Sequence, residues 1–107
     1  MIKRSLAVLA LAAVPAFAEP AKTPKIEGTF GFDVMKSERT KCAKVAGALL
    51  TKLTQDYRCK PPKGDGKAYS GGTIIAECKA KKGRGGYTLF ATLHDCEEER
   101  QTQAVAE

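Results

Sequence analysis

Residues 73–80, TIIAECKA, and residues 87–94, YTLFATLH, decide the fold, because both alternate apolar and polar side chains as β-strands do. The glycine-rich segment 81–86 between them suits a hairpin loop. Setting Ala80 opposite Tyr87 places every inward-facing residue opposite an apolar partner. The expected pairs are Cys78 with Leu89, Ala76 with Ala91, and Ile74 with Leu93. This stretch therefore predicts an antiparallel hairpin with one buried face.

Segment 38–55 predicts the main helix. Its apolar residues share one side at helical spacing, namely Cys42, Val45, Ala46, Leu49, Leu50 and Leu53. Ser37 is expected to cap this helix, with Glu38 in its first turn. Gly47 then falls in the middle of the helix, where glycine costs roughly 1 kcal/mol relative to alanine.

The remaining segments predict shorter elements. Residues 28–34 alternate as a strand does, and residues 57–60 form a second short strand that Pro61 and Pro62 end. Segment 63–72 is expected to be a loop, and about 96–104 a helix capped by Asp95. The resulting order predicts an α+β fold, a small two-layer domain. In it, an antiparallel sheet of about four strands (β-α-β-β-β-α along the chain) packs on one amphipathic helix.

Four cysteines allow three pairings, and the expected topology favours one of them. Cys42, at the start of the expected helix, and Cys96, after the last strand, are expected at the same end of the sheet. Cys59 and Cys78 are expected together at the opposite end of the sheet. Because bridged Cα atoms lie within about 7 Å, we expect the disulfides Cys42–Cys96 and Cys59–Cys78.

The first eighteen residues have the features of a cleaved secretory signal peptide. A basic start, Lys3-Arg4, precedes an apolar run, and Ala16-Phe17-Ala18 supplies the small residues that precede a cleavage site. Residues 19–27 are expected to form a flexible linker and 28–107 a single domain. The apolar run is too short to span a bilayer and no later stretch is longer, so no membrane insertion is expected. Periplasmic or secreted localisation suits disulfides.

Charge is distributed unevenly along the chain. From residue 36 to residue 84 there are thirteen Lys and Arg against four acids, a net +9. From Asp95 onward there are five acids and one Arg. Such a basic body can attract anionic partners, but a solvated surface that maintains solubility is the simpler and favoured explanation.

The sequence contains no recognisable catalytic or metal-binding motif. It lacks a CxxC, a P-loop and a dinucleotide fingerprint. His94 is the only histidine and is expected at a strand end, and residues 97–99, three glutamates, are expected to be a solvated helix start. We therefore expect a non-enzyme without metal or cofactor.

One constellation suggests a binding surface on the outer face of the sheet. Phe90 is expected to be exposed there, opposite Glu77, with cations around it. The candidate residues are Arg58, Lys60, Ile75, Lys79, Lys81, Lys82, Arg84 and Phe90. The alternative is that the C-terminal helix or the linker covers Ile75 and Phe90.

Two functions follow from this surface. The first is a small exported binding protein that acts on another exported protein, as an inhibitor or an accessory factor of the envelope. The second is a binder of an anionic polymer, either nucleic acid or surface polysaccharide, through the basic face.

Overall fold

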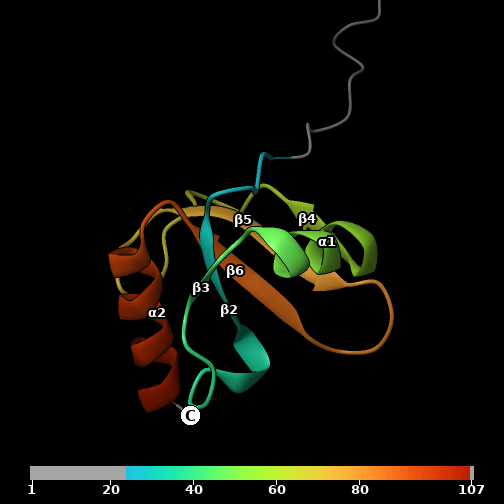
Figure 1. The fold of residues 1–107 in the computed structure, drawn as a ribbon. Helices are drawn as coiled ribbons and strands as arrows, with labels where there is room; N and C mark the ends of the chain where they lie inside the picture. The colour runs from blue at the N-terminus through green and yellow to red at the C-terminus, as the bar shows by residue number, and fades with distance from the viewer. Residues whose placement is uncertain (1–23, 107) are drawn as a thin grey trace, which may run out of the picture.

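The structure, a computed structural model, describes residues 24–106 and has an α+β architecture (Figure 1). The expected signal peptide and the start of the linker lie outside the described residues. The elements are β2 (Phe30–Asp33), the 3-10 helix η3 (Val34–Lys36), β3 (Ala43–Lys44), α1 (Gly47–Asp56), β4 (Tyr57–Lys60), β5 (Ile74–Ala80), β6 (Gly86–Phe90) and α2 (Leu93–Ala106).

The strands form one antiparallel sheet in the order β3-β2-β6-β5-β4. The sheet therefore has five strands, not about four. The additional strand, β3, lies within the segment expected to be helical and pairs Ala43 with Gly31. All five residues of β6 are buried, as suits the central strand.

The hairpin forms, but its register differs from the expected one by two residues. Cys78 lies opposite Tyr87, and Ala76 opposite Leu89. A shift of two residues keeps the same side chains on the same face, so the alternation of the sequence does not distinguish the two registers. A bulge at Ile75 then brings Ile74 opposite Phe90.

The main helix begins at Gly47, nine residues later than expected. Before it, the Val45 N–H donates to the Thr29 carbonyl at 2.7 Å, and the Gly28 N–H donates to the Val45 carbonyl at 2.9 Å. These bonds hold the chain against β2, and Gly47 then has a φ of +54°, a conformation that glycine adopts readily. Ser37 does not cap α1 but is buried at the end of η3.

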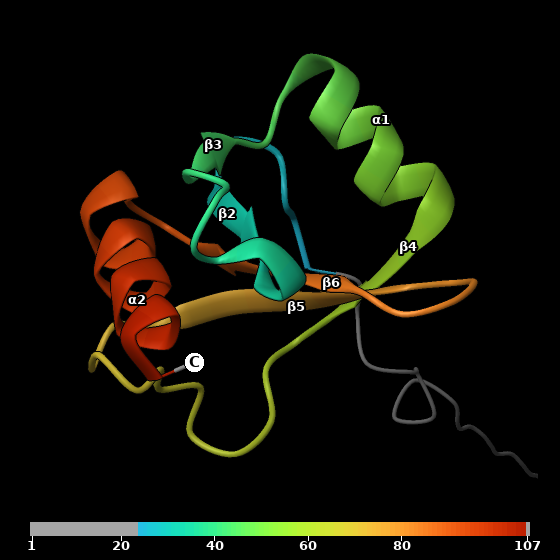
Figure 2. The same cartoon turned by 90° about the horizontal axis from the view of Figure 1, so that it is seen from below.

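Apolar side chains pack on both faces of the sheet. The larger cluster lies on the α1 side and contains Val45, Leu53, Ala76, Cys78, Tyr87 and Leu89. The second contains Phe32, Phe90 and Cys96 of α2. Figures 1 and 2 show the two helices far apart, with the strands between them. Ile26 packs against the larger cluster, so this cluster includes a residue that precedes Gly28.

Both expected disulfides are present. Cys42–Cys96 joins the segment before β3 to α2, and Cys59–Cys78 joins directly opposite residues of β4 and β5. The described residues contain no free cysteine. Two disulfides in so small a fold indicate an oxidising compartment.

Candidate functional site

The apolar part of the expected binding surface is not available on the outside. Phe90 is fully buried and packs with Phe32 and Cys96, so its expected exposure is wrong. The shifted register places Thr88, not Phe90, opposite Glu77. Ile75 is half-buried and packs against the α1-side cluster because of the bulge. The alternative, coverage by the C-terminal helix, holds for Phe90.

The cations of the expected surface are exposed and fall into two groups. Arg58 and Lys79 lie opposite each other on β4 and β5, with Lys60 two residues further along β4. Lys81, Lys82 and Arg84 lie in the loop between β5 and β6. The structure thus separates a short basic strip on the strands from a basic loop at the end of the hairpin.

The basic loop borders a cavity of about 440 Å³, which we call the hairpin-end cavity. It lies between the last turn of α1, the start of β4 and the loop. The lining residues are Lys52, Gln55, Asp56, Tyr57, Ala80, Lys81, Lys82 and Arg84. A hydrogen bond of 2.9 Å from the Lys81 N–H to the Asp56 carbonyl fixes the loop against the end of α1.

Lys52 in α1 also belongs to this site, although no sequence motif singled it out. Its Nζ lies 5.9 Å from the centroid of the Tyr57 ring and 5.6 Å from that of Tyr87. The two rings meet edge to face with centroids 5.6 Å apart. The electrostatic interaction with Tyr87 raises the pKa of Lys52, and burial raises the pKa of Tyr57. Lys52 therefore remains a cation over an aromatic pair.

No carboxylate in the described part of the chain lies at ion-pair distance from the cations of the hairpin-end cavity. Within residues 24–106 the one ion pair joins Arg100 to Glu97, at 2.7 Å in α2. Asp56 lines the cavity without forming an ion pair with the four cations around it. The cavity therefore carries an excess of positive charge that the fold itself does not neutralise.

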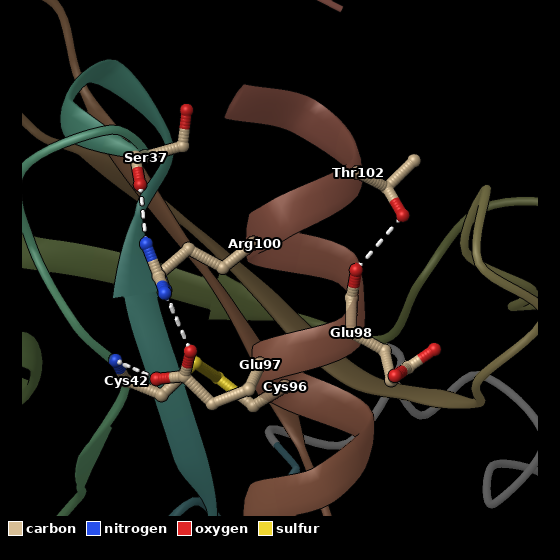
Figure 3. A network of polar contacts seen from close by, with 7 residues as sticks. All are labelled: Ser37, Cys42, Cys96, Glu97, Glu98, Arg100 and Thr102. Carbon is tan, nitrogen blue, oxygen red and sulfur yellow. Dashed lines mark hydrogen bonds and ion pairs between the residues drawn. A yellow bond between two sulfur atoms is a disulfide. The ribbon is translucent and has the colours of Figure 1, made fainter. Parts of the chain in front are cut away.

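Charges on α2 are used differently, as Figure 3 shows. The Glu97 carboxylate accepts a bond of 2.8 Å from the Cys42 N–H and a bond of 2.9 Å from Arg100 Nε. Arg100 also donates to the Ser37 carbonyl at 2.8 Å. The hydrogen bond from Arg100 lowers the pKa of Glu97. These contacts join α2 to the segment that precedes β3.

Two of the three glutamates, Glu97 and Glu99, are therefore not part of a solvated helix start, whereas Glu98 is exposed. Glu99 is only 2% exposed and accepts bonds of 2.8 Å from the Ser70 N–H and from Gln103 Nε2. The expected cap is also wrong, because α2 begins at Leu93 and Thr92 Oγ1 accepts the Asp95 N–H at 3.1 Å. The spacing of Thr92 and Asp95 matches a capping box, which was the available signal.

His94 is exposed and lines a smaller polar cavity of about 280 Å³ with Asp95, Glu98 and the loop 70–73. No group of three His, Cys, Asp or Glu side chains in the described part of the chain is placed to hold a metal ion. A third cavity, of about 330 Å³, lies beside the exposed Met35 and Lys79. Of these three cavities, the hairpin-end cavity alone combines several cations with an aromatic residue.

No helix among residues 24–106 is long and apolar enough to cross a membrane. Comparison with known proteins gives no match: no family model fits the chain, and no curated protein or solved structure is significantly similar to it. The geometry of the hairpin end is therefore the basis for a functional proposal.

Proposed function

We propose that the chain is a small exported, non-enzymatic binding protein that engages an anionic polymer through the basic residues at its hairpin end. The observation that carries the proposal is the group of four cations around one cavity, Lys52, Lys81, Lys82 and Arg84, which have no ion-pair partner among residues 24–106. An anionic ligand there replaces counterions without first breaking an internal ion pair. The signal sequence at residues 1–18 supports export to the periplasm or outright secretion.

The shape of the site adds support. The loop is short and is bonded to the end of α1 through Lys81 and Asp56, and α1 leads directly into β4, whose Cys59 is bridged to β5. The cations thus start from a backbone that is already fixed, which lowers the ordering cost of binding. Arg58, Lys60 and Lys79 add further exposed cations on the neighbouring residues of β4 and β5.

The first expected function, binding to another exported protein as an inhibitor or accessory factor, stays a prediction. The apolar surface on which it was based, at Ile75 and Phe90, is not exposed. Phe90 is inaccessible and Ile75 packs against the core, so the basic residues alone are available from that set.

Titration of two labelled polyanions, polygalacturonate and oligo-dT, against the protein at about 25 to 200 mM salt tests the proposal. We expect binding at low salt that weakens steeply as salt rises. The triple substitution Lys81→Ser, Lys82→Ser, Arg84→Ser should weaken binding at least tenfold and flatten the salt dependence.

The matched control removes three other exposed cations, with Lys36→Ser, Arg39→Ser and Lys44→Ser. None of these residues lines the hairpin-end cavity, and Lys44 lies in β3, at the opposite edge of the sheet from β4. The control should keep most of the affinity. An equal loss in both triple variants, or no binding of either polyanion at low salt, would refute the proposal.

A further inference from the structure

The hairpin-end cavity contains more than positive charge. Its lining residues include Tyr57, Gln55 and Asp56 beside the four cations. A site that needed only to attract phosphates would gain nothing from a carboxylate, because like charges repel. The mixed lining therefore points to a ligand that carries hydrogen-bond donors as well as negative charge.

Hydroxyl groups are donors of that kind. A carboxylate accepts hydrogen bonds only, whereas an amide both donates and accepts, so Asp56 and Gln55 together suit neighbouring hydroxyls. Both side chains are exposed at the last turn of α1, and neither takes part in a side-chain hydrogen bond within residues 24–106. The Asp56 backbone is held by its bond to Lys81, which keeps the carboxylate beside the basic loop.

The aromatic component has a fixed orientation. Tyr57 is half-buried, its ring meets Tyr87 edge to face, and the Lys52 ammonium lies within 6 Å of both centroids. Because Tyr57 lines the cavity, it contributes apolar surface there, against which the C–H groups of a sugar can pack. The volume, about 440 Å³, lies in the range of small-ligand sites and exceeds what a lone inorganic anion would fill.

We infer that the hairpin-end cavity binds one acidic sugar unit of an acidic polysaccharide. The sugar carboxylate lies among Lys81, Lys82 and Arg84. The hydroxyls donate to Asp56 and pair with Gln55, and the sugar ring packs on Tyr57. This inference rests on the proposed function and narrows its ligand from anionic polymers in general to acidic polysaccharides.

The Asp56→Ala variant tests the inference, because charge and hydrogen bonding predict opposite results for it. Loss of a carboxylate from a basic cavity should strengthen the binding of every polyanion if charge alone matters. If Asp56 accepts sugar hydroxyls, Asp56→Ala should instead weaken polygalacturonate binding about tenfold, while oligo-dT binding stays equal or becomes tighter. Glu38→Ala, a substitution with the same charge change at another exposed position, should not weaken either.

The outcomes separate the inference from the function on which it rests. Weaker polygalacturonate binding by Asp56→Ala, with no such loss for Glu38→Ala, supports an acidic-sugar site. Unchanged or tighter polygalacturonate binding by Asp56→Ala overturns the sugar site, as does tighter wild-type binding of oligo-dT than of polygalacturonate at equal salt. In both cases the function stands if the loop variant Lys81→Ser, Lys82→Ser, Arg84→Ser still loses affinity. If wild type binds neither polyanion at low salt, both proposals fall.

Discussion

At the α2 end of the molecule, the Glu97 and Glu99 carboxylates each accept hydrogen bonds from segments distant in the sequence. At the hairpin end, four cations surround a cavity, and none of them forms an ion pair within residues 24–106. The first arrangement uses charge to join α2 to the segments around Cys42 and Ser70. The second leaves charge facing solvent. Within one small domain, charged side chains therefore stabilise the fold where they have partners. Where they have none, they remain available to a ligand.

Loss of the disulfides should have the largest effect on stability, because each end of the molecule contains one of them. In the loop-entropy description Cys42–Cys96 is worth about 4 kcal/mol and Cys59–Cys78 about 3 kcal/mol, as upper and non-additive values. A domain of this size has a free energy of unfolding of roughly 5 to 10 kcal/mol. We expect excess reductant to unfold the protein largely, as measured by far-ultraviolet circular dichroism during a thermal melt.

The double variants separate the two ends. Cys42→Ala with Cys96→Ala should lower the melting temperature more than Cys59→Ala with Cys78→Ala, because the former bridge closes the longer loop. A melt that hardly moves in excess reductant would show that packing alone holds the fold.

Phe90→Ala should have the next largest effect, which is a loss of unfolding free energy. The side chain is fully buried beside Phe32 and Cys96, so its removal should cost about 3 to 5 kcal/mol of unfolding free energy. Urea denaturation measures this loss. Tyr69→Ala is the matched control, because Tyr69 is 88% exposed and its removal should change stability little. Equal, small losses in both variants would mean that α2 does not cover the sheet at Phe90.

The sequence predicts the α+β class, the hairpin, β4 and both disulfides, because alternation and cysteine geometry are strong local constraints. It fails where tertiary contacts override a helical pattern. Residues 43–45 have helical spacing with the segment that follows, yet their backbone bonds go to β2. The pairing Cys42–Cys96 is right although Cys42 is not in a helix, because the segment before β3 also runs beside α2.

The candidate site was predicted only in its cations. Exposed Lys81, Lys82 and Arg84 follow from a glycine-rich, charged loop. The exposure of Phe90 was wrong because its face of the sheet is covered, with Phe90 packed against Phe32 and Cys96. Lys52, Asp56 and Tyr57 join the site because α1 turns directly into β4 and returns beside the loop. That juxtaposition comes from long-range packing, which no local pattern in the chain reports.

Glu97→Gln should destabilise the fold less than loss of the disulfides or Phe90→Ala. The size of this effect should depend on pH. The hydrogen bond from Arg100 lowers the folded-state pKa of Glu97 below its ordinary value of 4.5. The stability that the ionised carboxylate contributes is therefore present above about pH 4.5 and is lost as pH falls through the lowered folded-state pKa. We expect Glu97→Gln to lose about 1 kcal/mol at pH 7, measured by urea denaturation, and less at low pH.

Glu98→Gln is the matched control on the same helix, because the Glu98 side chain is exposed and should contribute little at either pH. The hairpin variant Lys81→Ser, Lys82→Ser, Arg84→Ser completes the comparison. Its cations repel one another and have no carboxylate partner, so its stability at pH 7 should equal or exceed that of the wild type. A loss at pH 7 as large as that of Glu97→Gln would mean that these cations stabilise the fold, and the contrast between the two ends would disappear.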